Sequence, residues 1–272
     1  MENIRQAVER ARGRPAQQGG IGYEPPLQQA RHGFGVAHEN RELTQEVELN
    51  LAYLQSRRIV AYDGTDLRSR SFDMLRTEIL GSMDLKGWKT LAVTSPTPSC
   101  GKTLTAVNLA LSMAREPERQ VFLADLDLRK PQVAASLGLK GGEGVFGVIE
   151  GRIEVGDAVI RARAGSSKLE VLPTARASNP SDLVGSSAMR TFLQDITGLG
   201  QSRIVILDLP PLLTGHDVIS ILPQVDCVLL VAAVGTSTVS EIEECNKHLQ
   251  ATDLVRFVLN KAPESTTRYS YY

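Results

Sequence analysis

Short apolar runs that alternate with helix-length segments constrain the fold of this chain more than any other feature. The runs are TLAVT (90–94), VFLAD (121–125), KLEVLP (168–173), RIVILDLP (203–210), CVLLVAAV (227–234) and LVRFVLN (254–260). Helical patterns lie between most of them, at 104–114, 181–196 and 238–250. Strands that are apolar on both faces and separated by helices indicate a parallel sheet covered on both sides. We therefore expect an α/β fold with a single doubly wound, mostly parallel sheet and helices on both faces.

The composition predicts three parts along the chain. Residues 15–40 are rich in Gln, Gly, Pro and Arg, so we expect a disordered segment over residues 1–40. Its first residues have helical spacing, which we interpret as a short solvated helix rather than a docking helix. A domain over 41–262 follows, entered through an amphipathic stretch at 43–54. Residues 263–272 form a flexible tail with three of the six tyrosines: Tyr269, Tyr271 and Tyr272.

Charge and composition narrow the class of protein. The net charge of −1 gives no bias toward nucleic acid or anionic lipid. No stretch approaches the roughly 18 to 20 apolar residues that a membrane span needs, and the N-terminus has no signal-peptide core. Three separated cysteines (Cys100, Cys227 and Cys245) do not form a disulfide framework. We expect a cytoplasmic protein.

Polar residues follow the apolar runs, where ligands bind in a parallel sheet. The run at 90–94 leads into SPTPSCGKT, the run at 121–125 into DLDLRKP, and the later runs into DLPP and NK. Because ligands of open α/β sheets bind beyond the carboxyl ends of the strands, these motifs are expected to form one site.

The segment TSPTPSCGKT (94–103) follows a strand and opens a helix, as a phosphate-binding loop does. The strict pattern GxxxxGK[ST] fails, because its first glycine position holds Pro96. Backbone N–H groups of such a loop point at an anion, Lys102 bridges the β- and γ-phosphates, and the Thr103 hydroxyl holds Mg²⁺. The residues expected to contact the nucleotide here are Ser99, Cys100, Gly101, Lys102, Thr103 and Leu104.

Acidic residues end two of the other strands. Asp125 and Asp127 lie on the same side of an extended chain, which suits Mg²⁺ handling with one carboxylate left as a base. The alternative is a pair of helix-capping or surface aspartates. Asp208 ends the most apolar run, where a Walker-B carboxylate holds Mg²⁺ through water. Asn260 is expected to bind a base edge rather than only end its strand. ATP and Mg²⁺ are therefore the expected cofactors of a fold like that of P-loop NTPases.

These motifs, in this order, resemble the bacterial tyrosine kinase family of capsular and exopolysaccharide biosynthesis. That family carries a P-loop, a DxDxR motif, a Walker-B motif and a tyrosine-rich tail, matched here by SPTPSCGKT, DLDLR (125–129), ILDLPP (206–211) and RYSYY (268–272). FDMLRTEI (72–79) and LPTARASNPSDLVGS (172–186) also resemble family segments, so the likeness covers about 57–272. The stand-alone cytoplasmic form and the exosortase-associated autokinases look closest.

The resemblance implies an ATP- and Mg²⁺-dependent tyrosine autokinase that regulates polysaccharide synthesis and export. Its implied phosphoacceptors are Tyr269, Tyr271 and Tyr272, modified in trans within a homo-oligomer. Lys102 would bind phosphates, Thr103 and Asp208 would hold Mg²⁺, Asp127 would assist the metal, and Asp125 would accept the tyrosine proton. The implied activator is the cytoplasmic segment of a membrane polysaccharide co-polymerase, which would recruit the chain to the inner face of the membrane. No nucleic-acid partner is implied.

Two positions depart from the family pattern. Ser99 replaces a glycine of the loop, and the ring-forming ExxRxxR motif falls on Arg70, Asp73 and Arg76, with altered charge at two of the three positions. Compensating charge swaps across a subunit interface stay open.

Two other functions also stay open. One is a non-kinase P-loop ATPase switch of the partition type, although Thr97 occupies the place of its signature lysine. The other is a nucleotide-binding adaptor of a polysaccharide assembly system.

Overall fold

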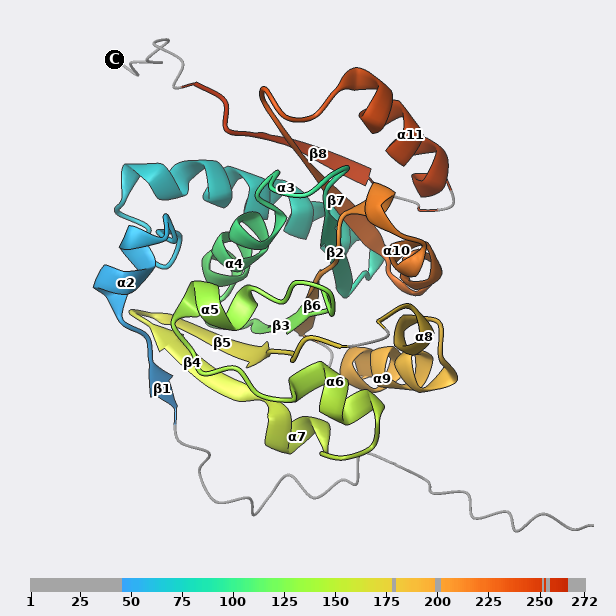
Figure 1. Cartoon of the computed structure of the whole chain (residues 1–272). Coiled ribbons are helices and arrows are strands. Elements are labelled where there is room, and N and C mark those ends of the chain that lie inside the picture. The colour runs from blue at the N-terminus through green and yellow to red at the C-terminus, as the bar shows by residue number, and fades with distance from the viewer. Residues whose placement is uncertain (1–45, 178–179, 199–201, 251, 253–254, 264–272) are drawn as a thin grey trace, which may run out of the picture. The chain divides into compact units, whose positions relative to one another are not determined.

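The computed structural model describes residues 46–263 except 178–179, 199–201, 251 and 253–254 (Figure 1). The predicted disordered segment at 1–40 and the three tail tyrosines Tyr269, Tyr271 and Tyr272 lie outside the described residues.

Within the described residues, eight strands form one sheet in the order β1-β4-β5-β3-β6-β2-β7-β8. Their bounds are β1 (Val47–Glu48), β2 (Thr90–Thr94), β3 (Gln120–Asp125), β4 (Ile160–Ala164), β5 (Ser167–Leu172), β6 (Arg203–Asp208), β7 (Cys227–Ala233) and β8 (Val255–Asn260). Neighbouring strands are parallel except β4 and β5, which are antiparallel. The predicted doubly wound, mostly parallel sheet is confirmed.

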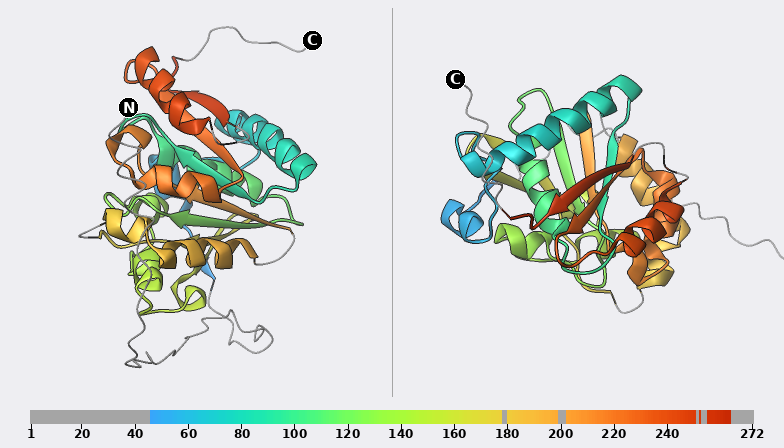
Figure 2. Two further views of the ribbon diagram at one scale, coloured as in Figure 1. Left: turned by 90° about the vertical axis from the view of Figure 1, so that its right-hand side faces the viewer. Right: turned by 90° about the horizontal axis from the view of Figure 1, so that it is seen from above.

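Helices cover both faces of this sheet (Figure 2). One face carries α2 (Leu51–Ser56), α3 (Arg70–Lys86), α4 (Lys102–Met113) and α5 (Val133–Leu137). The other carries α6 (Gly144–Ile149), α7 (Val155–Ala158), α8 (Pro180–Val184), α9 (Ser187–Gly198), α10 (Asp217–Ile221) and α11 (Val239–Leu249). Short 3₁₀ turns lie at Leu67–Ser69, Leu212–Thr214 and Leu222–Gln224.

The continuous apolar runs follow from this two-sided burial. Successive strand side chains point to opposite faces, so Leu91 and Val93 of β2 pack in one apolar cluster and Ala92 packs in the other. Helix α4 lies between α3 and the sheet, and ten of its twelve residues are buried. That burial explains why its sequence is apolar nearly all round rather than along one stripe.

A buried amide on α4 fixes the segment that leads into the domain. The Oδ1 atom of Asn108 accepts hydrogen bonds from the backbone N–H groups of Val60 (2.9 Å) and Ala61 (3.1 Å). Its Nδ2 atom donates to the carbonyl oxygens of Leu104 (2.9 Å) and Arg58 (3.2 Å). With all its polar groups satisfied, this side chain holds residues 58–61 against the helix that begins at the phosphate loop.

The structure differs from the sequence-based expectations at the sheet edge. The described part of the amphipathic stretch at 43–54 is divided between a strand and a helix, because Val47 pairs with Ala162 in β1 and α2 begins at Leu51. The antiparallel strand β4 has no continuous apolar run, since exposed and buried residues alternate along IRARA. The helix predicted at 181–196 is divided into α8 and α9.

Candidate active site

The phosphate loop joins β2 to α4 and contains two residues in the left-handed region. Ser99 has φ 67° and Gly101 has φ 97°. The left-handed conformation of Ser99 costs about 1–2 kcal/mol relative to the right-handed conformation that a serine usually adopts. At position 101 no other residue fits this conformation without a shift, because an added Cβ atom would lie 2.1 Å from the Asn260 Nδ2 atom. Loops of this kind turn their N–H groups inward and form anion-binding concavities.

Three motifs converge on the ammonium group of Lys102. Its Nζ atom lies 2.8 Å from Asp127 Oδ2 and 3.5 Å from Asp208 Oδ1. Thr103, the next residue, donates its hydroxyl to Asp208 Oδ2 at 2.6 Å. Burial by itself lowers the pKa of Lys102, but the charges of Asp208 and Asp127 outweigh it and the pKa is raised. The lysine is therefore a fixed cation at the carboxyl end of the sheet.

Asp208 has a carboxylate oxygen that suits a cation. The side chain is fully buried, and its Oδ1 atom makes no hydrogen bond within the described part of the chain. Burial raises the pKa of Asp208, while the charge of Lys102 and the hydrogen bond from Thr103 oppose the rise. A buried carboxylate oxygen without a hydrogen bond is costly unless a cation faces it, and the only cation that the described residues place beside this atom is Lys102 Nζ, at 3.5 Å. Hard oxygen donors of this kind fit Mg²⁺.

The protein alone supplies few of the ligands that a metal needs. Among the described residues, no group of three or more His, Cys, Asp or Glu side chains is placed to hold a metal ion. Mg²⁺ commonly takes one or two protein ligands and completes its shell with water and substrate phosphates. Thr103 and Asp208 therefore fit a magnesium–nucleotide complex better than a metal held by the protein alone.

Asp125 is buried and organises the segment that follows it. Its Oδ2 atom accepts hydrogen bonds from the backbone N–H groups of Gln132 and Val133, both at 2.9 Å, at the start of α5. Its Oδ1 atom accepts one from Asp127 N at 3.2 Å. Burial and then the charge of Asp208 raise the pKa of Asp125 to about 7, against the backbone hydrogen bonds and Lys102. The helix-capping alternative thus describes its contacts, and its role as a base stays a prediction.

Asn260 holds the loop in place from the end of β8. Its Nδ2 atom donates to the Cys100 carbonyl oxygen at 2.9 Å, and its Oδ1 atom accepts from Lys261 N at 2.8 Å. Cys100 is buried, with its Sγ atom 3.4 Å from Ser237 Oγ. The expected contact between Asn260 and a base stays a prediction, and its observed role is to fix the loop.

An open pocket of about 460 Å³ lies over these residues, within the size range of ligand pockets. Of the residues assigned to the site from the sequence, Ser99, Gly101, Lys102, Thr103, Leu104 and Asp127 line it, whereas Cys100, Asp125, Asp208 and Asn260 do not. The lining also includes Arg57, Arg129 and Lys130, to which sequence reasoning assigned no role. Arg129 and Lys130 belong to the DLDLRKP motif and could have been singled out, whereas no motif marks Arg57.

Comparisons with known proteins agree with this arrangement. No protein-family model matches the chain. The chain is 30% identical over 222 residues to the putative tyrosine-protein kinase EpsB of Ralstonia solanacearum. The matched region covers 80% of this chain and 28% of EpsB. It is 28% identical to the tyrosine-protein kinase YwqD of Bacillus subtilis, over 80% of this chain and 92% of YwqD.

The solved kinase domain of the Escherichia coli tyrosine kinase ETK has the same fold, with a TM-score of 0.68 and 26% identity over 79% of this chain and 84% of that domain. The chain belongs to the bacterial tyrosine kinase family. The chain spans less than a third of the length of EpsB but nearly all of YwqD.

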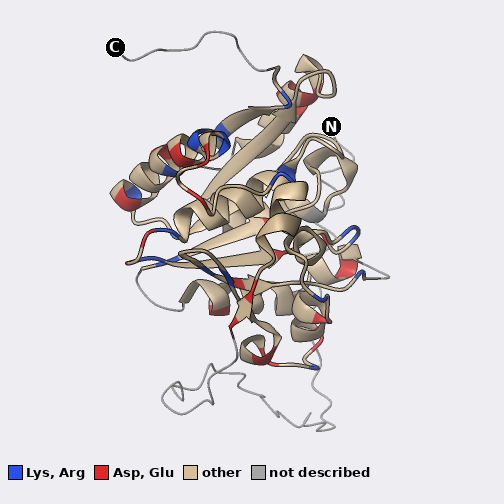
Figure 3. Ribbon diagram, turned by 90° about the vertical axis from the view of Figure 1, so that its left-hand side faces the viewer, with Lys and Arg blue, Asp and Glu red and all other residues tan. Residues whose placement is uncertain are grey.

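Two of the three positions of the ring-forming motif, Asp73 and Arg76, contact residues of the same chain from the charged helix α3 (Figure 3). Asp73 Oδ1 accepts hydrogen bonds from Ser112 Oγ at 2.6 Å and from Arg115 Nη2 at 2.5 Å. Arg76 Nη1 donates to the Ser112 carbonyl oxygen at 3.0 Å, and its Nε atom lies 3.4 Å from Glu116 Oε1. Arg70 is exposed. The altered residue Asp73 and the unaltered Arg76 thus tie α3 to the far end of α4.

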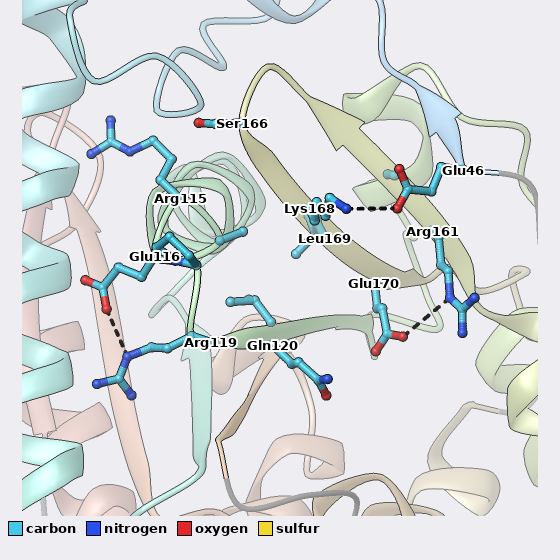
Figure 4. A pocket seen from close by; sticks show the side chains of 14 residues that line it. Glu46, Arg115, Glu116, Arg119, Gln120, Arg161, Ser166, Lys168, Leu169 and Glu170 are labelled. Atoms are coloured by element: carbon cyan, nitrogen blue, oxygen red, sulfur yellow. Dashed lines mark hydrogen bonds and ion pairs between the residues drawn. The ribbon is translucent and has the colours of Figure 1, made fainter. Parts of the chain in front are cut away.

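A second hollow of about 480 Å³ lies at that end of α4, beside the β4–β5 hairpin (Figure 4). Ion pairs surround it: Lys168 with Glu46 at 3.6 Å, Arg161 with Glu170 at 3.8 Å, and Arg119 with Glu116 at 2.9 Å. None of the predicted nucleotide-binding residues lines it. The candidate active site is therefore the pocket over the phosphate loop.

Proposed function

We propose that this chain is an ATP-dependent protein-tyrosine autokinase that regulates exopolysaccharide or capsule synthesis and export. The observation that carries the proposal is that Lys102, Thr103 and Asp127 line one pocket at the end of the sheet and that the buried Asp208 contacts both Lys102 and Thr103. The γ-phosphate of ATP is transferred to tail tyrosines, for which Tyr269, Tyr271 and Tyr272 are the candidates. The relatives EpsB, named as a putative tyrosine-protein kinase, and YwqD, named as a tyrosine-protein kinase, support the same reaction.

The loop and Lys102 bind and orient the nucleotide phosphates. Lys102 is suited to this role because its charge is held in place by Asp127 and Asp208 on one side of the pocket. Thr103 and Asp208 are the residues that would hold Mg²⁺, with Asp127 assisting. Bound Mg²⁺ supplies neutralisation of the phosphate charge that develops during transfer.

The transfer itself needs a proton acceptor and an aligned tyrosine. The tyrosine oxygen forms a bond to the γ-phosphorus as the bond from that phosphorus to the β–γ bridging oxygen breaks, and ADP leaves. The tyrosine proton goes to Asp125, whose pKa near 7 is suitable for a general base. Positioning and charge neutralisation provide most of the rate in such chemistry.

The proposed acceptor is the tail of another copy of this chain. An extended segment of about ten residues spans up to roughly 33 Å, which is long enough to reach a neighbouring site. The proposed activator is the cytoplasmic segment of a membrane polysaccharide co-polymerase. This partner would recruit the chain to the inner face of the membrane. Among the described residues, no helix is long and apolar enough to cross a bilayer.

One experiment distinguishes this function from the ATPase switch and the adaptor. The purified chain is incubated with ATP and Mg²⁺, with and without the candidate activator segment, and phosphotyrosine is mapped by mass spectrometry beside an assay of ATP turnover. Tail phosphotyrosine that is absent in Lys102→Met supports the kinase. ATP turnover without phosphotyrosine identifies the switch, and ATP binding without either identifies the adaptor.

A further inference from the structure

Exposed apolar side chains gather at the edge of the sheet that ends in β8. Phe257 and Leu259 of β8 are 51% and 62% exposed, and Val234, which follows β7, is exposed as well. Figure 2 shows β8 at the free end of the sheet, between α3 and α11. Apolar surface that is gathered in this way on a folded domain marks a contact with a partner.

The backbone of β8 leaves one row of polar groups open. Among the described strands β8 pairs only with β7, and the Asn260 carbonyl oxygen accepts a hydrogen bond from Val234 N at 3.0 Å. Successive residues of a strand direct their backbone groups to opposite sides, so those of Val258 and Asn260 face β7 and those of Phe257 and Leu259 face outward. A mostly apolar edge of six residues is a template for another strand.

A groove of about 550 Å³ runs beside this edge, on the face of the sheet that carries α3 and α4. Phe72, Met74 and Leu75 of α3 line one side of it, and residues 258–262 line the other. Met74 is largely exposed. An element that pairs with β8 can therefore bury apolar surface in addition to forming backbone hydrogen bonds.

A second copy of β8 fits this edge. In an antiparallel pair related by a two-fold axis, opposite residues lie on the same face, and residues with outward backbone groups pair with each other. An axis at Val258 meets both conditions, because it places Phe257 opposite the partner's Leu259 and Arg256 opposite the partner's Asn260. Each exposed apolar side chain of β8 then covers one of the partner, and no like charges face each other.

Charges along the edge favour the same arrangement. Helix α3 ends at Lys86, shortly before β2 begins at Thr90, so it runs from the carboxyl ends of the strands toward their amino ends. Lys261 lies beyond the carboxyl end of β8, whereas the exposed Glu78 lies further along α3, and both line the groove. A two-fold axis reverses the direction of the edge, so the basic end of each copy faces the acidic part of the other.

We propose that two copies of this chain associate by antiparallel pairing of their β8 edges, with Val258 on the two-fold axis. Asp73 and Arg76 are engaged within the chain, so contacts between copies need another surface. The inference rests on the proposed function only in supplying the contact that transfer between copies requires.

The paired edges adjoin both nucleotide sites. Asn260 ends β8 and donates to the Cys100 carbonyl oxygen of the phosphate loop. In the proposed register Asn260 and the partner's Asn260 are offset by four residues, or about 14 Å along the strands. That offset is well within the roughly 33 Å that an extended tail of ten residues spans. The tail of one copy could thus reach the site of the other.

Sedimentation equilibrium of the full chain measures the proposed dimer directly. We expect a dimer whose dissociation constant rises tenfold or more in Leu259→Lys, because a charge on an open edge strand opposes pairing. Val47→Lys is the matched control, since Val47 is an exposed apolar residue of β1 at the opposite edge of the sheet. It should leave the dissociation constant unchanged.

Cysteine cross-linking tests the register. In Val258→Cys the two thiols face each other across the axis, with Cα atoms about 4.5 Å apart, which a disulfide can bridge. In Arg256→Cys the corresponding Cα atoms are about 14 Å apart, so no bridge can form. Oxidised glutathione should convert only the first variant into a covalent dimer. The unsubstituted chain gives the background, because its cysteines Cys100, Cys227 and Cys245 are buried.

Three results would overturn the inference: a monomer at every concentration, a dissociation constant that Leu259→Lys does not change, or equal cross-linking of Val258→Cys and Arg256→Cys. Hydrogen exchange identifies another occupant of the edge. A monomer whose β8 amides become protected only when the candidate activator segment is added would assign the edge to the activator.

This inference and the proposed function fail separately. Tail phosphotyrosine in a chain that forms no β8 dimer would remove the paired edge and leave the kinase function standing. A β8 dimer in a chain that never forms phosphotyrosine would remove the kinase function and leave the paired edge.

Discussion

Replacing Asp73 by alanine should destabilise the folded chain, because its carboxylate balances a buried cation. Arg115 has a side chain only 14% exposed, and its Nη2 atom lies 2.5 Å from Asp73 Oδ1. Burial tends to raise the pKa of Asp73, but the hydrogen bonds from Ser112 and Arg115 lower it below its usual value. Losing one partner of a buried pair costs about 3–5 kcal/mol, and partial exposure of this pair reduces the expected cost to about 2–3 kcal/mol.

Urea denaturation of the full chain measures this cost, with Arg70→Ala as the control. Arg70 lies on the same helix but is exposed, so its replacement should change the free energy of unfolding by no more than about 0.5 kcal/mol. The same small change for Asp73→Ala would refute the argument. Sedimentation under folding conditions adds a second readout, since an intrachain contact predicts an unchanged assembly state. An oligomer that dissociates in Asp73→Ala without loss of stability would mean that the residue acts between subunits.

Three further outcomes follow from the site. Gly101→Ala should weaken ATP binding by tenfold or more in isothermal titration, because the added Cβ atom would lie 2.1 Å from Asn260 Nδ2 on a left-handed backbone. Adding Asn260→Ala to this variant should restore part of the lost affinity. A wild-type affinity in Gly101→Ala would contradict the loop geometry. Asp208→Asn should weaken Mg²⁺-dependent ATP binding. The same variant should stabilise the metal-free chain toward urea, because burial disfavours the charged carboxylate and raises the pKa of Asp208. Unchanged ATP binding with and without Mg²⁺ would contradict the role of Asp208. Because the pKa of Asp125 is raised in the folded chain, protonation of Asp125 stabilises the fold. This contribution is complete at pH values below the ordinary pKa of 3.8 and is lost as the pH rises through about 7. Urea denaturation across that window should show a weaker pH dependence in Asp125→Asn, and identical slopes would show that Asp125 does not titrate there.

The sheet could be predicted where burial leaves a strong pattern. The run at 90–94 coincides with β2, because a strand buried on both faces must be apolar throughout. Strand β4 was missed because one of its faces is partly exposed and the apolar pattern is interrupted. The pairing of Val47 with Ala162 depends on the register of distant segments, which local sequence does not specify.

The candidate site could be predicted only in part. Lys102, Thr103 and Asp208 follow from motifs at strand ends, and the structure brings them together. The contacts of Asp125 with the backbone at the start of α5 could not be anticipated, since they depend on how the chain folds back after the motif and not on the residues of the motif itself. Arg57 was missed because no motif marks it. It reaches the pocket from the end of α2, where it donates to the hydroxyl of Tyr53, and Tyr53 in turn contacts α5.

Phosphate transfer between two marked copies of the chain tests the central claim most directly. A Lys102→Met chain with an intact tail is mixed with an active chain whose Tyr269, Tyr271 and Tyr272 are replaced by phenylalanine, in ATP and Mg²⁺. The account predicts phosphotyrosine on the tail of the Lys102→Met chain, detected by peptide mass spectrometry. A tail that stays unmodified while the active chain continues to turn over ATP would contradict the account.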